Sequence, residues 1–244
     1  MVNQKPIRRL ADYLGTLRTV VFCTDDLQLV KGSAKSRRRF LDLLLTQTQP
    51  GYLDLLHRYT ESLRSRNALL KGDTPDTTLL ESFTAELIST GNKLMTARKG
   101  LAEKLSPLVR IGYRKIASKP EDAKMDYAPS VMHDFAIELA KSRIREQRYR
   151  STIVGPHRDE VKLSLNHKPA SEYASEGQKR TLAISLKMAQ ADYLTGVHGS
   201  PPILLIDDVM GELDAGRRAG LMPMIQRTGQ ALGQIFMTLS LIHI

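Results

Sequence analysis

The chain has 244 residues, of which 41% are apolar and 25% charged, and its net charge at pH 7 is +10. This length allows one or two domains, and no apolar run approaches the roughly 20 residues that a membrane span needs. Cys23 is the only cysteine, which excludes an internal disulfide. With no apolar signal-peptide core near the start, the protein is expected to be cytoplasmic and not to enter a membrane.

The chain begins as α/β material and then becomes helical. Residues 8–17 predict a short helix, and residues 18–23 are β-branched and apolar. The second stretch predicts a buried strand, with Cys23 as a buried, small apolar side chain at its end. From about 36 to 150 the apolar residues recur at helical spacing, and residues 77–105 predict one long helix.

The middle of the chain contains a break in this helical pattern. Residues 118–129, SKPEDAKMDYAP, are polar and contain two prolines, so they predict a loop before another helix at 130–149. After residue 151 the β-branched residues return, and Asn166-His167-Lys168 predicts a hairpin turn.

The last part of the chain alternates helices and strands. The patterns predict a helix at 176–194 ending near Gly196, a strand at 203–206, a helix at 215–232 and a strand at 234–238. The whole arrangement indicates a helical insertion between two α/β pieces.

Two short segments concentrate the positive charge. KGSAKSRRR at 31–39 carries five basic residues and no acid, and KSRIREQRYR at 141–150 carries five basic residues and one acid. Such segments can bind DNA or RNA, or they can be solvated helix faces. Arg37, Arg38 and Arg39 are therefore candidate contacts to DNA phosphates, with helix capping as the alternative.

The segment PPILLIDDVMGELD, residues 201–214, places two carboxylates directly after an apolar strand. Ligands of parallel α/β sheets bind beyond the carboxyl ends of the strands. Asp207 at that edge could hold Mg²⁺, and Asp208 could accept a proton from an attacking water, as in the Walker B arrangement of nucleotide hydrolysis. Alternatively, the two acids cap the strand end and neutralise a neighbouring helix.

A second motif opens the helix predicted at 176. Ser175 and Gln178 have the spacing of a capping box, and Gly177 lets the backbone approach a ligand closely. Free backbone N–H groups at a helix N-terminus bind phosphate, and Lys179 and Arg180 add positive charge. The alternative is an ordinary helix cap.

Together the two motifs resemble the heads of ABC-type ATPases. Ser175 to Gln178 would be the signature motif, with Glu176 where many members carry Gly, and Asp214 falls at the D-loop aspartate. The fold class that this resemblance implies is α/β, a partial ABC-type ATPase head with a largely helical second lobe inserted.

The resemblance narrows to the RecF family of bacterial replication and repair proteins. TDDLQLVKGSAKSRRRFLD (24–42), RYTESLRSRNALLK (58–71) and GPHRDEV (155–161) are similar to RecF segments. So are SEGQKRTLAISLKMA and LLIDDVMGELDAGRR, and the resemblance extends from about 3 to 238.

The chain departs from the family pattern at a few positions. Thr24 and Ala34 stand where prolines are usual, Gly211 where Ser or Ala is usual, and Asp25-Asp26 replaces a Glu-Asp pair. None of these changes removes a carboxylate or a phosphate-binding group, so only local loop shape is in question.

The resemblance implies an ATP- and Mg²⁺-dependent homodimer on single- or double-stranded DNA at gaps or junctions. It also implies partnership with RecR and RecO, and through them RecA loading in DNA repair and the SOS response. In such dimers ATP lies between the Walker motifs of one subunit and the signature of the other, here Ser175, Gly177 and Gln178. The alternatives are a non-enzymatic DNA-binding fragment and another SMC-like ABC head.

The phosphate-cradling motif GxxxxGK[ST] is not present, because no Gly in the sequence is followed by Lys. In RecF-like proteins this loop lies upstream, so we expect a fragment that does not hydrolyse ATP on its own. The terminal LSLIHI resembles a translated sequencing adapter, with a natural apolar tail as the alternative, and no function is assigned to His243. The expected divisions are a remnant of the first head lobe at 1–34, a mostly helical second lobe with the signature at 35–200, the head with Walker B and the D-loop at 201–238, and a non-native tail at 239–244.

Four further side chains have mainly structural interpretations. His157 in Gly-Pro-His-Arg-Asp has no partners at ligand spacing, which favours a hydrogen-bonded structural residue over a metal ligand. Tyr52 and Tyr59, together with Leu56, fall at helical spacing and predict core packing rather than a base-stacking platform.

Overall fold

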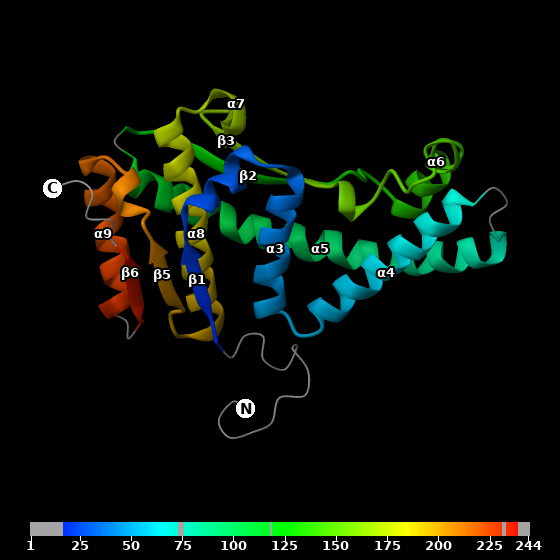
Figure 1. Ribbon diagram of the computed structural model, residues 1–244, viewed down its shortest axis with the longest axis horizontal. Helices are drawn as coiled ribbons and strands as arrows, with labels where there is room; N and C mark the ends of the chain where they lie inside the picture. Colours follow the sequence, from blue (N-terminus) through cyan, green and yellow to red (C-terminus); the bar gives the residue numbers. More distant parts are fainter. Residues whose placement is uncertain (1–16, 73–75, 118, 231–232, 239–244) are drawn as a thin grey trace, which may run out of the picture.

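The computed structural model describes residues 17–72, 76–117, 119–230 and 233–238 (Figure 1). The strands are β1 Thr19–Phe22, β2 Ala123–Ala128, β3 Glu160–Leu165, β4 Lys168–Pro169, β5 Ile203–Asp207 and β6 Ile235–Thr238. The α-helices are α2 Gln28–Lys31, α3 Ala34–Thr48, α4 Tyr52–Lys71, α5 Thr77–Ile116, α6 Phe135–Tyr149, α7 Ala170–Tyr173, α8 Glu176–His198 and α9 Ala215–Gln230. Short 3₁₀ turns are η1 Thr24–Leu27, η2 Pro156–Arg158 and η3 Met210–Glu212.

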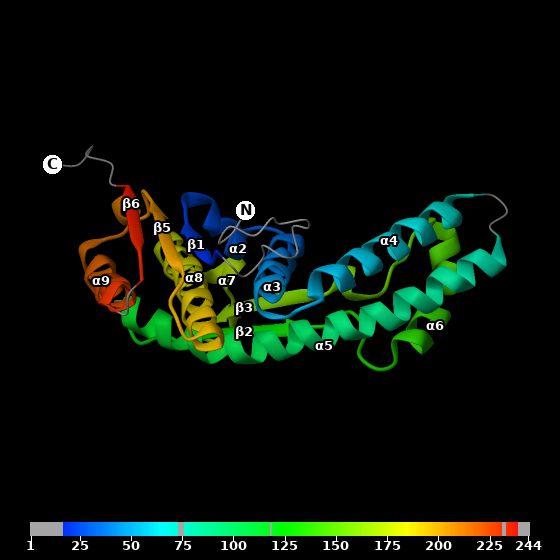
Figure 2. The same ribbon diagram turned by 90° about the horizontal axis from the view of Figure 1, so that it is seen from below.

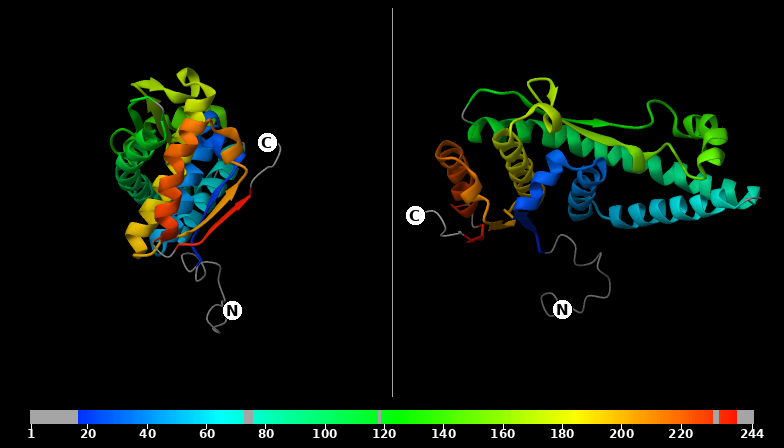
Figure 3. Two further views of the ribbon diagram at one scale, coloured as in Figure 1. Left: turned by 90° about the vertical axis from the view of Figure 1, so that its left-hand side faces the viewer. Right: turned by 45° about the horizontal axis from the view of Figure 1, so that its top comes forward.

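A parallel sheet brings the two ends of the described chain together. Its order is β1-β5-β6, with Val20 opposite Leu204 and Ile206 opposite Met237. Helix α8 packs on β1, and α9 lies at the other end of the sheet (Figures 1 and 3). The predicted α/β pieces are therefore one sheet, with the helical segment inserted between its first two strands in the sequence.

Helix α5 is long and contacts most of the other helices. Its 40 residues correspond to a length of about 60 Å. Helix α4 packs along its N-terminal half and α8 crosses its C-terminal half (Figure 2). The helix continues past the predicted end at 105 because Val109, Tyr113 and Ile116 extend the buried stripe, and Pro107 is accommodated within it.

A second sheet, antiparallel in the order β2-β3-β4, covers the middle of α5. The prediction of a loop throughout 118–129 was wrong, because Ala123–Ala128 forms β2. Ala123 and Met125 are buried on one face of the strand and pair with β3. The alternation of buried and exposed residues is short and lies among acidic residues and prolines, so the sequence pattern did not indicate a strand. The hairpin turn was predicted correctly, and Asn166 and His167 both adopt positive φ there.

Other predictions need smaller adjustments. Helix α6 begins at Phe135, where Asp134 accepts from the Ile137 N–H, rather than at 130. Cys23 is half-buried rather than fully buried. The predicted helix at 8–17 and the tail at 239–244 lie outside the described residues, except for Leu17. None of the helices in the described part combines the length and apolar character required to cross a membrane.

A buried ion pair joins three segments at the end of the molecule distant from the parallel sheet. The Arg66 guanidinium on α4 donates to Glu146 on α6 at 2.7 Å, and also to the Thr152 hydroxyl. Glu146 is fully buried, and its other carboxylate oxygen accepts from the Ile153 N–H. Because each ion has a partner, this contact can fix α6 against α4.

Candidate functional site

The two candidate catalytic carboxylates lie at the carboxyl edge of the parallel sheet. Asp207 is the last residue of β5 and is paired in register with Thr238, the last residue of β6. The Thr238 hydroxyl donates to Asp207 Oδ1 at 2.6 Å and accepts from the Asp208 N–H at 3.1 Å. One threonine therefore fixes both the side chain of the first acid and the backbone of the second.

Asp208 has a backbone conformation that ends the strand sharply. Its φ is +53°, in the left-handed region that residues other than glycine seldom adopt. Gly211 lies nearby, and a Cβ added there would be 3.5 Å from Asp208 Oδ1, an ordinary van der Waals contact. Space for a Cβ is thus available at Gly211, so replacing Gly211 by alanine would not need Asp208 to move.

The helix that carries the signature residues has the predicted capping box. Ser175 Oγ accepts from the Gln178 N–H at 3.3 Å, and Gln178 Oε1 accepts from the Ser175 N–H at 2.6 Å. Gln178 Nε2 also donates to Glu121, which accepts from the buried Tyr113 hydroxyl through its other oxygen. Gln178 is thus held within its own chain, while Ser175 is exposed at the start of α8.

Gly177 and Asp214 are connected through Arg217. A Cβ at Gly177 would come within 2.9 Å of Arg217 Nη1. Arg217 Nε donates to Thr181 Oγ1 on the second turn of α8 at 2.9 Å, and its Nη1 pairs with Asp214. Asp214 Oδ1 accepts from the Arg217 N–H at 2.9 Å, and this backbone hydrogen bond is the main reason that the pKa of Asp214 is lowered.

The segment around α2 also contacts α8, a relationship that sequence reasoning missed. Lys31 forms an ion pair with Glu176 in the first turn of α8, which lowers the pKa of that carboxyl. Asp26 pairs with Lys187 at 3.2 Å, although burial keeps the pKa of Asp26 raised. The only sequence signal was opposite charge in two separate motifs, and this does not specify the pairing.

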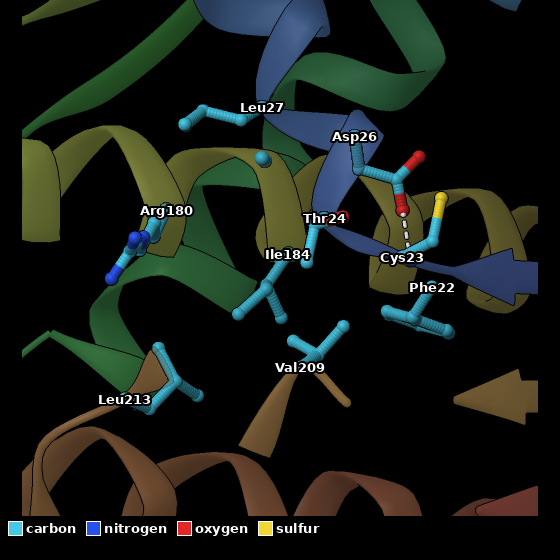
Figure 4. Close-up of a pocket in the computed structure, with 10 residues that line it drawn as sticks. Phe22, Cys23, Thr24, Asp26, Leu27, Arg180, Ile184, Val209 and Leu213 are labelled. Carbon is cyan, nitrogen blue, oxygen red and sulfur yellow. Dashed lines mark hydrogen bonds between the residues drawn. The ribbon is translucent and has the colours of Figure 1, made fainter. Parts of the chain in front are cut away.

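A small cavity lies where these segments meet (Figure 4). It is bordered by the residues after β1, the first turns of α8, and Val209 and Leu213 after β5. Its volume of about 20 Å³ is enough for one water molecule but not for a nucleotide. The described residues thus supply carboxylates and a helix N-terminus, and the phosphate cradle is not among them.

The candidate DNA-contacting arginines have different surroundings. Arg37 makes a bidentate pair with Glu160 at 2.9 and 3.0 Å, and its side chain is only 13% exposed. Arg38 donates to the Asp159 carbonyl, whereas Arg39 is exposed on α3. Two of the three arginines thus anchor α3 to the start of β3, and Arg39 is the one that faces solvent.

His157 is a structural residue, as predicted. Its Nδ1 lies 2.6 Å from the Tyr59 hydroxyl and its Nε2 lies 3.1 Å from the Thr152 carbonyl. Burial lowers the pKa of His157 to about 4. Tyr52 and Tyr59 are both 3% exposed, which confirms their prediction as core residues. Among the described residues there is no group of three or more His, Cys, Asp or Glu side chains that could hold a metal.

Comparison with known proteins identifies relatives over almost the whole chain, although no model of a protein family matches it. The DNA replication and repair protein RecF of Cyanothece sp. is 41% identical over 246 residues, which cover 95% of this chain and 65% of that protein. The corresponding protein of Rippkaea orientalis is 36% identical, with 99% of this chain and 69% of the relative covered. The chain thus spans about two thirds of the length of these relatives.

The solved structures agree. A structure of the recombination mediator protein RecF with ATP, from the RecFOR pathway, has a TM-score of 0.85 and 29% identity, and covers 99% of this chain and 67% of that one. A second RecF structure has a TM-score of 0.84 over 96% of this chain. These similarities confirm the predicted fold, a part of an ABC-type ATPase head with a helical lobe. The chain therefore belongs to the RecF family of DNA replication and repair proteins.

Proposed function

We propose that this chain is the part of a RecF protein that carries the catalytic carboxylates and the signature helix. The intact protein would be an ATP-dependent DNA-binding protein of recombinational repair. The observation that carries this proposal is the arrangement of Asp207 and Asp208, both held by Thr238 at the carboxyl edge of a parallel sheet. Membership of the RecF family supports it, since a RecF structure with ATP is a close structural neighbour.

The donor atoms at this edge fit Mg²⁺. Asp207 would hold the ion, with the Thr238 hydroxyl orienting its carboxylate, because hard cations prefer oxygen ligands. When bound, the ion would supply neutralisation of charge on the β- and γ-phosphates. Asp208 would accept the proton of the attacking water, and the positive φ at this residue ends the strand where the carboxylate is needed.

The signature helix would act on the nucleotide of a second subunit. Ser175 is exposed at the N-terminus of α8, where its hydroxyl and the first backbone N–H groups can meet a γ-phosphate. Gly177 and Gln178 would act indirectly, because Arg217 covers the first and Glu121 engages the second. This arrangement supports an ATP-dependent homodimer.

DNA and the proteins RecR and RecO would be the partners, with RecA loading at gaps as the outcome. The net charge of +10 supports binding to DNA. Arg145 and Arg148 are exposed on α6, and Arg39 is exposed on α3. These three are better candidates for phosphate contacts than Arg37 and Arg38, whose guanidinium groups are engaged within the fold.

Fluorescence anisotropy with a labelled DNA duplex at several salt concentrations tests the DNA-binding proposal. We expect weak binding that falls steeply with salt, and a log–log slope that decreases by about one unit for each phosphate-binding side chain that is replaced. Arg145→Glu with Arg148→Glu should weaken binding about tenfold or more, and Arg39→Glu should add to this effect.

Arg114→Glu is the control, because it alters an exposed arginine near the C-terminal end of α5, far from α6 (Figure 1). DNA binding weakened equally by Arg114→Glu and by each of the single variants Arg145→Glu and Arg148→Glu would show only a response to net charge. That result would refute a DNA-binding surface on α6. Binding that no reversal changes would refute contacts by Arg39, Arg145 and Arg148 together.

A further inference from the structure

An open groove lies between α3 and α4, outside the candidate nucleotide site. The two helices diverge from the turn at Pro50-Gly51 (Figures 1 and 3). The groove has a volume of about 550 Å³ and is bounded by one face of each helix, with Arg98 and His157 at its base. A cavity of this size could receive several side chains of a partner.

The walls of the groove are mostly apolar. Leu53, Leu56 and Leu63 line it from α4, and Leu43 faces it from α3. The span from Leu53 to Leu63 is ten residues, or about 15 Å of helix, which is close to three turns. Leu43 is 50% exposed, whereas Leu53, Leu56 and Leu63 are half-buried, so part of this apolar wall is open to water.

The polar groups at the base of the groove already have partners. Both oxygens of Asp42 accept from Arg98 at 2.8 Å, and one of them also accepts from the Tyr52 hydroxyl at 2.6 Å. His157 bonds with Tyr59 and with a backbone carbonyl. The base is therefore electrostatically satisfied, and a ligand need only cover apolar surface there.

The rim on the α3 side is basic. Lys35, Arg38 and Arg39 all border the groove, and Lys35 and Arg39 are exposed. The one acidic residue in the lining, Asp42, is neutralised by Arg98. A complementary ligand therefore combines an apolar face with negative charge along one side.

We infer that this groove binds an acidic amphipathic helix of a partner protein. Such a helix places apolar residues at i, i+3, i+4 and i+7 against the leucines and acidic residues against the basic rim. The apolar walls disfavour DNA as the occupant, because phosphates gain nothing from contact with leucine. This inference does not depend on ATP or on the carboxylates at the edge of the parallel sheet.

The test uses this chain and a fluorescein-labelled helical peptide of about 18 residues, with leucines on one face and glutamates beside them. A scrambled peptide of the same composition spreads the leucines around the helix. We expect micromolar binding of the first peptide by anisotropy and at least tenfold weaker binding of the second.

Leu43→Glu and Thr60→Glu each place a negative charge in the groove at an exposed position and should weaken peptide binding about tenfold or more. Ile144→Glu is the matched control, since it makes the same change of charge at an 81% exposed residue on α6. Arg39→Glu should weaken binding and reduce its salt dependence. Circular dichroism checks that every variant is folded.

The inference is overturned if the amphipathic peptide does not bind, or if Ile144→Glu weakens it as much as Leu43→Glu. It is also overturned if Leu43→Glu abolishes a chain dimer in sedimentation while the peptide fails to bind, which would assign the groove to a second copy. Displacement of the peptide by duplex DNA, together with loss of DNA binding in Leu43→Glu, would assign it to nucleic acid. Loss of DNA binding in the α6 reversals with unchanged peptide binding would separate this inference from the proposed function and support it.

Discussion

Arg217 lies directly over Gly177, so that the start of α9 and the first turn of α8 are in contact within one chain. A Cβ on residue 177 would approach Arg217 Nη1 to 2.9 Å, and the same guanidinium donates to Thr181 and pairs with Asp214. A side chain at this position would therefore have to displace the Arg217 guanidinium. Because Arg217 contacts both Asp214 and the first turns of α8, a displacement of Asp214 would also move the guanidinium that lies against Gly177.

We predict that Gly177→Ala and Arg217→Ala are strongly non-additive. The new methyl group in Gly177→Ala displaces the Arg217 guanidinium and weakens its contacts with Thr181 and Asp214. In the double variant, Arg217→Ala therefore removes contacts that are already weakened and costs less stability than it does alone. The coupling in the free energy of unfolding should be at least ~0.5 kcal/mol, measured by urea denaturation of the four proteins in the cycle.

Gly100 offers the control for this cycle. It lies within α5, and a Cβ there would have no neighbour within 4 Å. Gly100→Ala should stabilise the helix by roughly 0.5–1 kcal/mol and should add independently to Arg217→Ala. Strict additivity for both glycines would contradict the contact between Gly177 and Arg217.

A second prediction concerns the buried pair of Arg66 and Glu146. Glu146→Ala leaves the guanidinium, which is 4% exposed, without its carboxylate in the interior. Removing one partner of such a pair should lower the free energy of unfolding by about 3–5 kcal/mol. Glu138→Ala on the same helix breaks only an exposed pair with Lys141 and should cost no more than about 0.5 kcal/mol. Similar losses in both variants by urea denaturation would contradict a special role of the buried pair.

The third prediction is a pH dependence caused by His157. Burial holds the pKa of this histidine at about 4 in the folded protein, below its ordinary value of about 6.5. Protons therefore bind the unfolded chain preferentially as pH falls from about 6.5 towards 4, and stability is lost across this window. The loss from this residue between pH 7.5 and pH 5 should be on the order of 2 kcal/mol.

His157→Gln should flatten this part of the profile, since glutamine does not titrate. His57→Gln, the same substitution at an exposed position on α4, provides the matched control. Unfolding free energies from pH 4.5 to pH 8 provide the measurement. A wild-type profile that His157→Gln does not alter would show that this histidine is not buried in its neutral form.

Local patterns were sufficient for the elements near the candidate site. The apolar run before Asp207 predicted β5, and the spacing of Ser175 and Gln178 predicted the capping box that the structure has. Both signals depend only on residues close in sequence. The predicted helix ended at residue 105 and was too short, since α5 continues through Pro107 and its buried face extends to Ile116.

Long-range pairings could not be predicted in the same way. Thr238 is 31 residues from Asp207, and the register of two strands decides that they meet. Arg37 has the sequence pattern of a surface cation because Glu160, its partner, is 123 residues away. Charge patterns in a sequence show how many cations there are, whereas burial and partner choice follow from the tertiary packing.

The last prediction separates the two halves of the proposed nucleotide site. It uses a chimera in which the upstream segment of the Cyanothece relative precedes residue 17, with the unextended chain as the control expected to lack ATP turnover. Asp208→Asn removes the proposed base, and should lower turnover about 100-fold or more while ATP still binds and the dimer persists. Ser175→Arg adds bulk at the exposed N-terminus of α8, and should spare ATP binding by the monomer while preventing dimerisation and turnover.

Analytical ultracentrifugation with and without ATP, combined with an ATPase assay, distinguishes these outcomes. Ser175 is exposed and is not part of the Asp207–Thr238 contact, so its replacement should leave the subunit's own carboxylates undisturbed. Normal dimerisation of Ser175→Arg, or loss of ATP binding by its monomer, would show that α8 does not act on the opposite subunit. Unchanged turnover in Asp208→Asn would remove the proposed base and leave Asp207 as the only functional carboxylate at this edge. Both variants should lose turnover, but only Ser175→Arg should lose ATP-dependent dimerisation, because the two residues belong to opposite sides of the proposed interface.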